Sequence, residues 1–557
     1  KENTVVKLHS RPIAALALVL ALSARTQLQA QDVKPIAVVS ISSVNELLGD
    51  ANYLLGAAGQ QGFGALIPLI VDPQLNGIDR TKPIGAYVTM EGIQNPLEDL
   101  PGVVLFVPVS DANAVMQTLQ LALMAQIEDV AGGLKKVDLG DGAPYFLKVD
   151  GGWLFGSNKS EQLADLPEDP GTMLDGLDKS HDLAVRINVQ NIPKPFRDLA
   201  VMQIKQGYEG ALAGGLPPGV EGAEGLVDQG LENMESLIQD SHQITLGMGI
   251  DKAKKNTFFD MSYTAVPGSK LAQQMAASAD VKTAFGGFQL PGAAVTAMST
   301  QKVSPEDLQQ AMVAVDAFRE QVLAELENDP SLNDPQIRAS VKEVVDIFFD
   351  VGTSTAKTGV LDTAATLLLQ EQSMTFIAGV KVAAGDKLDT AVRKLVELSK
   401  DQPDFPEVKV DADQYKGIHF HTLNVPIPAG EAQLVLGDAL DGVLGIGKDA
   451  VYMAFGKDAL GTLKQAIDSS GDNNAKASAA MKMVVSLGAI VKFMASVQPD
   501  ETLDRLAEAV ETLQGSDQVN ILYETIKDGV RGTLTIDEGV IELLGKAVPD
   551  PAAGGGF

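Results

Sequence analysis

Cysteine is absent from this chain of 557 residues, and aromatic side chains make up only 5% of it. Without cysteine the chain can form no disulfide and no thiolate metal site, and it has no cysteine nucleophile or lipid-modified N-terminal cysteine. Sugar-binding clefts use stacked aromatic rings, so the low aromatic content also disfavours a glycosidase. Trp153, the only tryptophan, is expected in a core or an interface.

Sequence motifs of common enzyme classes are missing as well. There is no Gly-x-Ser-x-Gly elbow, no His-Glu-x-x-His helix and no phosphate-binding loop of the Walker type. Of the five histidines, His419 and His421 stand two apart on an expected strand, so their side chains would face the same side. They could ligate a metal, but no third ligand can be placed, as zinc requires. We expect exposed or hydrogen-bonded strand side chains there, each worth roughly ±0.5 kcal/mol of stability, and we expect His242 at a polar strand entry.

Two acidic segments are candidates for loose calcium binding, Asp411-Ala412-Asp413 and residues 468–474. Neither has the glycine at the sixth position and the late glutamate that an EF-hand loop needs. Carboxylates are so abundant in this chain that no particular pair indicates an acid–base site. The sequence therefore predicts no catalytic residue, no cofactor-binding residue and no metal ligand.

The chain is strongly acidic, with a formal net charge of −30. Such a surface repels phosphate backbones, so nucleic acid is not expected as a partner. Self-repulsion of this kind is typical of a soluble protein that stays dispersed.

The first thirty residues have the order of a secretory signal. Basic residues come first, an apolar run follows at residues 12–22, and polar and small residues occupy residues 23–30. The run is too short to span a bilayer comfortably. We predict that the signal is cleaved after Ala30, with Ala24 as the alternative cleavage site. The other alternative is that the segment stays uncleaved as an N-terminal anchor. A second apolar stretch, residues 477–497, is interrupted by two lysines and reads as a strand followed by an amphipathic helix. Export without cysteine fits a bacterial periplasm or exterior.

The longest pattern in the chain occurs twice. Phe155-Gly156 and Phe455-Gly456 each close an apolar strand, and Leu163 or Leu463 follows in a short helical stretch. A repeat at this long spacing indicates duplicated domains and not solenoid units. We expect Phe155 and Phe455 to lie in equivalent buried positions, each beneath the helix that follows its glycine.

Strands and helices are expected in the same order in both halves of the chain. In the first half the expected strands are 35–41, 84–90, 103–109, 134–139, 145–149, 153–155, 183–187, 241–246 and 258–264, with helices at 43–55 and 112–127. In the second half they are 291–298, 364–369, 374–382, 407–410, 418–423, 442–446, 451–455, 483–487, 516–521 and 532–536, with helices after Ser304 and at 388–398. Asp-Gly pairs at 141–142 and 150–151 indicate hairpin turns in the first half, and turns are expected at Lys416-Gly417 and Lys448-Asp449 in the second. Strands in hairpins with interspersed helices predict an α+β fold with mostly antiparallel sheets.

We divide the chain accordingly into a signal peptide at residues 1–30, a first α+β repeat at 31–280, a second at 281–547 and a disordered tail at 548–557. Glycine- and proline-rich stretches at 210–225 and 330–335 are expected as loops. The signal, the repeated strand–helix–meander pattern and the Phe-Gly signature together resemble large uncharacterised exported proteins of bacterial envelopes, classed as domains of unknown function. That resemblance covers nearly the whole mature chain and implies no catalytic residues.

Apolar content is high for an exported acidic protein, and helices near residues 115–124 and 199–204 carry wide apolar faces. Core burial explains such faces, and a lipid-sized cavity between helices and a curved sheet is the alternative. The sequence predicts a non-enzymatic, exported binding or scaffold protein of the cell envelope or extracellular space. A carrier of an apolar, lipid-like ligand in an internal cavity and a hydrolase without a recognisable motif are the alternatives. An envelope protein or an apolar ligand is the expected partner, with no membrane span after signal cleavage.

Overall fold

The computed structural model describes residues 34–547, apart from residues 91–92, 94–100, 124–125, 139–143, 213–223, 278–280, 330–331, 333, 401–405, 472–478 and 499. The predicted signal peptide with its cleavage sites at Ala24 and Ala30, the predicted tail at 548–557 and the expected turn at 141–142 lie outside the described residues. Helices and antiparallel strands together make up the described chain, so the predicted α+β class is confirmed. Across these described ranges, no helix is both long enough and apolar enough to cross a bilayer.

The chain divides into two compact units. Unit 1 comprises Lys1–Ile204, Ser241–Lys254 and Phe258–Tyr263, and unit 2 comprises Lys205–Asp240, Lys255–Thr257 and Thr264–Phe557. Each unit is described by itself below.

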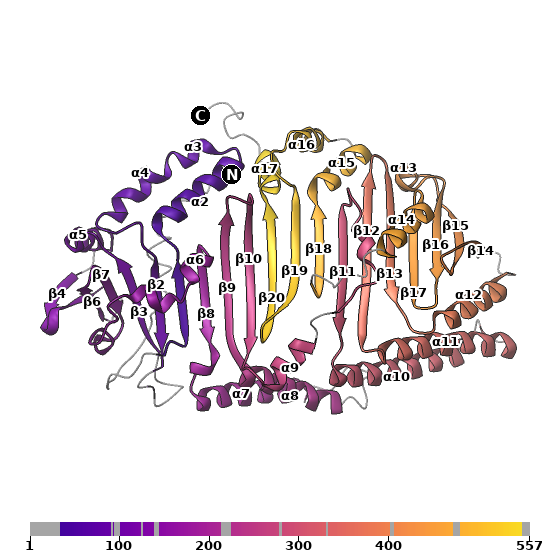
Figure 1. The fold of residues 1–557 in the computed structure, drawn as a ribbon, viewed down its shortest axis with the longest axis horizontal. Helices are drawn as coiled ribbons and strands as arrows, with labels where there is room; N and C mark the ends of the chain where they lie inside the picture. The colour runs from indigo at the N-terminus through magenta and orange to yellow at the C-terminus, as the bar shows by residue number, and fades with distance from the viewer. Residues whose placement is uncertain are drawn as a thin grey trace, which may run out of the picture. The chain divides into compact units, whose positions relative to one another are not determined.

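The sheet of unit 1 places its hydrogen-bonded strands side by side in one layer (Figure 1). In spatial order the strands are β4 (Gln126–Val130), β5 (Leu134–Asp138), β6 (Pro144–Asp150), β7 (Trp153–Ser157), β3 (Gly102–Pro108), β2 (Ile84–Thr89), β1 (Ala37–Ile41), β8 (Leu183–Asn188), β9 (Ser241–Asp251) and β10 (Asn256–Ala265).

The sheet of unit 2 is also antiparallel. In spatial order its strands are β14 (Glu407–Tyr415), β15 (Ile418–Pro426), β16 (Ala439–Ile446), β17 (Ala450–Gly456), β13 (Ser373–Lys381), β12 (Val360–Gln370), β11 (Val295–Lys302), β18 (Met481–Ser486), β19 (Gln518–Ile526) and β20 (Gly529–Asp537). This spatial order is that of unit 1 with ten added to every strand number.

Helices connect and cover the strands. The α-helices are α2 (Val44–Ala57), α3 (Gln61–Gly64), α4 (Ile67–Val71), α5 (Ala112–Leu123), α6 (Leu177–Ser180), α7 (Lys194–Leu212), α8 (Glu224–Asp240), α9 (Lys270–Ala277), α10 (Pro305–Asn328), α11 (Pro335–Ala356), α12 (Gly385–Ser399), α13 (Glu431–Leu436), α14 (Ala459–Gly471), α15 (Leu487–Val497), α16 (Glu501–Glu511) and α17 (Glu538–Ala547). The 3-10 helices are η1 (Asp72–Leu75), η2 (Ala131–Gly133), η3 (Ser160–Leu163), η4 (Pro170–Leu174), η5 (Val189–Asn191) and η6 (Gly286–Phe288).

Local sequence explains where several helices begin. The Ser43 side chain accepts a hydrogen bond from the Glu46 amide (3.1 Å) at the start of α2, as an N-cap does. Asp334 caps α11 in the same way and Pro335 occupies its first turn, so the second half of the expected loop at 330–335 is a helix start. One prediction here is wrong: α5 ends at Leu123, and β4 begins where a helix through residue 127 was expected.

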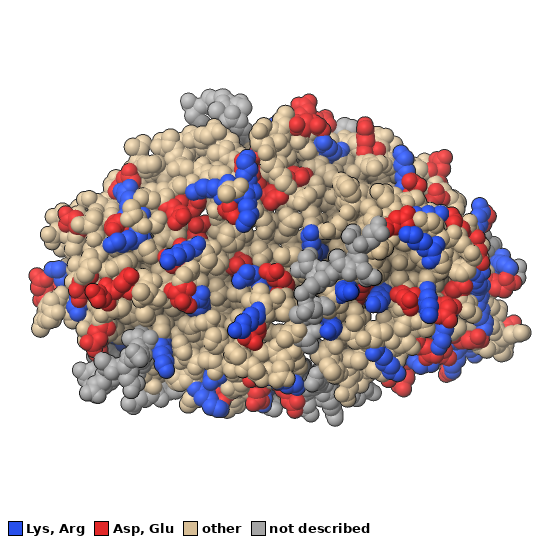
Figure 2. Space-filling model, in the orientation of Figure 1, with Lys and Arg blue, Asp and Glu red and all other residues tan. Residues whose placement is uncertain are grey.

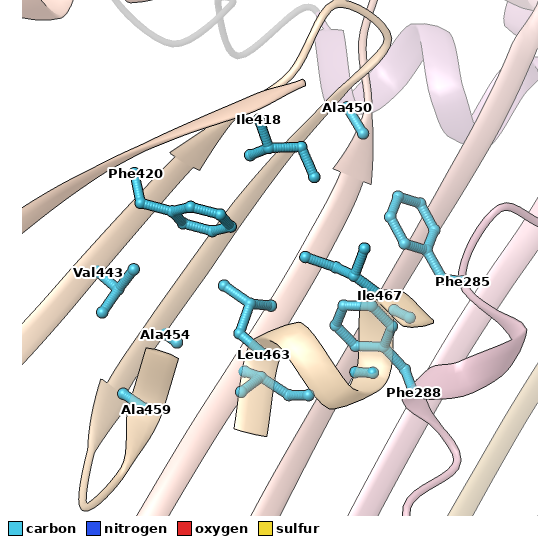
Figure 3. Close-up of a cluster of buried hydrophobic side chains, with 13 residues drawn as sticks. Phe285, Phe288, Ile418, Phe420, Val443, Ala450, Ala454, Ala459, Leu463 and Ile467 are labelled. Carbon is cyan, nitrogen blue, oxygen red and sulfur yellow. The ribbon is translucent and has the colours of Figure 1, made fainter. Parts of the chain in front are cut away.

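One face of each sheet carries the main hydrophobic core. In unit 1, Trp153, Phe155 and Leu163 are buried together, which confirms the predicted core position of Trp153. In unit 2, Leu463 and Ile467 of α14 pack on the sheet beside the fully buried rings of Phe285 and Phe288 (Figure 3). We call these the core faces.

The predicted equivalence of Phe155 and Phe455 is wrong. Phe155 is 1% exposed and lies on the core face of unit 1 with Leu163. In unit 2 the residue that packs with Leu463 is Ala454, while Phe455 stacks on Phe376 with ring centroids 4.9 Å apart. Successive residues of a strand point to opposite faces of the sheet. The core-face position held by Phe155 in unit 1 is therefore held in unit 2 by Ala454, one residue before Phe455.

Candidate functional site

The face of the unit 2 sheet opposite the core face is apolar and partly exposed. We call it the open face. Its members on the central strands alternate with core-face residues and are Val295, Ala297, Ser299, Leu361, Thr363, Ala365, Leu367, Met374, Phe376, Ala378, Val380, Val451, Met453, Phe455, Met481, Met483, Val485, Val519, Ile521 and Tyr523. At these positions, all of which the structure describes, there is no charged side chain.

That composition is unusual for a face that water can reach. An antiparallel sheet with one solvated face normally alternates apolar residues inward with polar residues outward. Here Met453 is 51% exposed and Met481 is 42% exposed on the outward side. A contiguous exposed apolar surface on a folded protein marks a place where something binds.

A groove of about 460 Å³ runs across the strands of the open face. Its two walls are two parallel rows of side chains that run across the strands. Within each row, the side chains are partners on neighbouring strands. One row is Met481, Ser299, Thr363, Val380 and Val451, and the other is Ala297, Ala365, Ala378, Met453 and Leu444. Between the rows the floor is backbone, because the side chains of Met298, Ala364 and Tyr452 point to the core face.

Glycine at the centre of the floor lets the core pack closely against the other side of the sheet. A Cβ on Gly379 would lie 2.5 Å from the ring of Phe285, which fills the core face directly beneath the groove. One end of the groove is closed by helices, because Leu388 of α12 and Val351 of α11 pack against Leu444 and Val451, which are partly buried there. The other end, at β18, continues toward Tyr523, which stands opposite Met481 on β19 and is 39% exposed.

A polar network lies elsewhere in unit 2, where α12 meets β14 and β15. Asp389 accepts a hydrogen bond from Arg393 Nε (2.8 Å) and lies at hydrogen-bond distance from His421 Nε2 (2.9 Å). Arg393 also pairs with Asp411 (2.6 Å), and the Asp411 amide donates to His421 Nδ1 (3.3 Å). His419 Nδ1 lies 2.8 Å from Asp411, so the network joins two carboxylates, two imidazoles and one guanidinium. His421 is only 2% exposed, so of the two environments expected for this pair, exposed or hydrogen-bonded, His421 has the hydrogen-bonded one.

Charge pairing favours the ionised form of the two carboxylates in this network. Hydrogen bonds from Arg393, and then from His419, hold the pKa of Asp411 well below its usual range. Burial opposes ionisation of Asp389, yet the Arg393 hydrogen bond leaves its pKa lowered as well. Stability from these two carboxylates is present above their unfolded pKa of about 3.9 and is lost as the pH falls below it toward the folded values.

Asp389, Asp411 and His421 offer ligand atoms within 4.8 Å of one another, which is close enough for a metal ion. Arg393, however, already supplies the positive charge between the two carboxylates, and both nitrogens of His421 are engaged. A divalent ion would have to displace the guanidinium, so the donor set fits an internal ion pair better than a metal centre.

The remaining candidates from the sequence are spread apart. Asp413 pairs with Lys464 and Asp468 pairs with Lys416, each at 2.6 Å, while residues 472–474 of the second acidic segment lie outside the described part of the chain. His242 lies on β9 in unit 1. Asp389 and Arg393 were missed by sequence reasoning, although their spacing of four residues on a helix suits an ion pair.

A hydrogen-bonded chain in unit 1 has the connectivity of a catalytic triad. Ser180 Oγ lies 2.8 Å from His181 Nδ1, and His181 Nε2 lies 2.8 Å from Asp260. The Ser180 hydroxyl also lies within hydrogen-bond distance of the carbonyls of Gly176 (3.1 Å) and Leu177 (3.3 Å), which are the N-cap and the first residue of α6. A serine hydroxyl that bonds to the carbonyls three and four residues before it is common in helices, so local backbone bonding explains these contacts without a catalytic role.

Charged side chains of both signs are interspersed on the face of the molecule drawn in Figure 2. Among the described residues of that face there is no large basic patch of the kind that binds nucleic acid.

Comparisons of the chain with protein-family models, curated proteins and solved structures found no match. The groove on the open face is therefore the candidate site with the clearest physical basis.

Replacing His421 with alanine should lower the free energy of unfolding by about 1 to 3 kcal/mol, because the buried imidazole is lost and the part-buried Asp411 amide and Asp389 carboxylate lose a partner. The matched variant His419→Ala removes a side chain that is 39% exposed, and we expect a change of about 0.5 kcal/mol. Urea unfolding of both variants, with and without EDTA, is the measurement. Destabilisation of the wild type by EDTA to the level of His421→Ala would contradict this account and indicate a metal.

Proposed function

We propose that this chain is an exported, non-enzymatic binding protein of the cell envelope or extracellular space, and that unit 2 holds an apolar ligand in the groove of its open face. The observation that carries the proposal is a groove of about 460 Å³ without a charged side chain pointing into it, on a partly exposed sheet. Export rests on the signal-like order of the first thirty residues.

The energetics of the groove favour a ligand. Each Å² of apolar surface removed from water contributes about 25 cal/mol, so a hydrocarbon that covers the groove would gain affinity without any polar contact. Flexible methionines at the rim, Met453 and Met481, can adapt to ligands of different shape. The groove is open along one side, so the proposal differs from the alternative given by the sequence, in which a carrier encloses its ligand in an internal cavity.

We further propose that the two units arose by duplication of one ancestral domain. The shared spatial order of ten strands supports this. A helix also follows the third strand of each unit, α5 after β3 and α12 after β13, and it covers the same neighbouring strand. In unit 1, α5 buries Leu154 of β7 with Val115 and Met116. In unit 2, α12 buries Val451 of β17 with Leu388. Independent origins would have to reach the same order of ten strands twice.

Filling the groove tests the proposed function. Ala365→Trp places an indole between the two rows of side chains and should weaken binding of the fluorescent fatty acid cis-parinaric acid at least 10-fold, a loss of about 1.4 kcal/mol or more. Titration of the probe into purified protein is the measurement.

Val313→Trp is the matched control, because Val313 lies on α10 and is 46% exposed. The control should bind the probe as the wild type does, and both variants should keep the wild-type melting temperature. Equal binding by Ala365→Trp and the wild type would rule out the groove as the site.

A further inference from the structure

The dimensions of the groove limit what can lie in it. Its walls are side chains two residues apart on each strand, such as Ala297 and Ser299, so they stand about 7 Å apart. It crosses from β17 to β18 over four strand spacings, a length of roughly 19 Å. An α-helix, at about 10 Å or more across, is too wide for such a channel.

The chemistry of the floor limits the occupant further. The floor strands β11, β12, β13 and β17 are interior strands whose backbone groups pair with neighbours on both sides. A peptide that binds by adding a strand needs a free sheet edge, and the groove runs across the strands instead. Ser299 and Thr363 bring the only hydroxyls that point between the described walls.

We infer that the occupant is one extended alkyl chain that lies across the strands from β17 to β18. This inference rests on the proposed function and adds the shape of the ligand to it. A polymethylene chain is narrow, needs no hydrogen bonds and spans a comparable distance, since one leaflet of a bilayer core of about 30 Å is roughly 15 Å deep. The methyl end lies at Leu444 and Val451 beneath α11 and α12, because that end is closed. The polar end leaves at β18 beside Tyr523.

A chain-length series tests the shape. Saturated fatty acids from octanoic to octadecanoic acid compete with cis-parinaric acid for the wild-type protein. Affinity should rise about 4-fold per methylene, the equivalent of ~0.8 kcal/mol, until the chain outgrows the groove and the gain stops. Lysophosphatidylcholine with the same chain reveals whether a phospholipid headgroup is accepted in place of a carboxylate. Cholesterol should compete at least 10-fold less well than hexadecanoic acid.

Each outcome separates the inference from the proposed function. Tight competition by cholesterol, or an affinity that does not depend on chain length, would overturn the linear-chain inference while the groove still binds apolar ligands. Failure of the probe and of every competitor to bind would overturn the proposed function itself.

Orientation is tested with a single label, since the chain has no cysteine of its own. A bimane fluorophore on Tyr523→Cys should be quenched more by a fatty acid that carries a nitroxide near its carboxylate than by one that carries it near its methyl end. The reverse order of quenching would contradict the assigned direction of the chain.

Discussion

Replacing Phe155 with alanine should lower the free energy of unfolding of unit 1 by about 3 to 5 kcal/mol. The ring is 1% exposed and belongs to the cluster that contains Phe106, Trp153 and Leu163. Alanine would leave a cavity that these rigidly held neighbours cannot fill. Trp153 is the only tryptophan of the chain and lies in the same cluster, so its fluorescence during urea unfolding reports directly on this unit.

Phe455→Ala is the informative comparison, because the two phenylalanines share the Phe-Gly context but not the environment. Phe455 lies on the open face of unit 2 and contacts the ring of Phe376 at a centroid distance of 4.9 Å. Replacing it with alanine should lower the free energy of unfolding by about 1 to 2 kcal/mol. This is the combined contribution of its partly buried apolar surface and of its contact with one other ring. Equal losses at Phe155 and Phe455 would contradict the assignment of the two rings to different faces.

Strand positions were predictable because turn residues and apolar runs are local signals. The Lys416-Gly417 turn between β14 and β15 is one example: both residues have positive φ, 49° and 77°, as a tight hairpin requires. The strand and helix expected across residues 477–497 are likewise found, as β18 and α15. Such features depend on neighbouring residues alone.

Which face each strand residue takes was not predictable at the site. In β12 the sequence Thr363-Ala-Ala-Thr-Leu-Leu-Leu is apolar at odd and even positions alike. A shift of one residue exchanges the two faces, and a strand that is apolar on both gives no pattern to reveal the shift. The misplaced Phe455 and the unforeseen open face have this single cause.

The groove and the polar network also depend on contacts between distant segments. Strand β13 pairs with β17, not with the next strand in sequence, and this pairing brings Val380 against Val451. His421 reaches Asp389 across 32 positions of sequence. No local pattern encodes such pairings, because they follow from the sheet order.

Replacing Asp362 with alanine should lower the free energy of unfolding of unit 2 by at least about 3 kcal/mol, because two buried hydroxyl donors and one part-buried amide lose their acceptor at once. The carboxylate is 1% exposed and accepts from the Thr283 hydroxyl (2.9 Å), the Thr300 hydroxyl (2.8 Å) and the Ala284 amide (2.7 Å). Two of these donors belong to the segment that carries Phe285 into the core beneath the groove. Asp362 therefore holds the floor of the groove as well as the core face.

Two matched variants separate the hydrogen bonds from the loss of volume. Asp362→Asn keeps the shape but turns an amide donor toward one of the three donors, and we expect a loss of about 1 to 3 kcal/mol. Thr300→Val removes one donor and keeps the volume, so its cost should be smaller than that of Asp362→Ala. Urea unfolding followed by circular dichroism ranks the three variants, and cis-parinaric acid binding reports on the groove. If Asp362→Ala unfolds like the wild type, the carboxylate does not anchor the segment; if it is destabilised but binds the probe unchanged, the groove floor does not depend on Phe285.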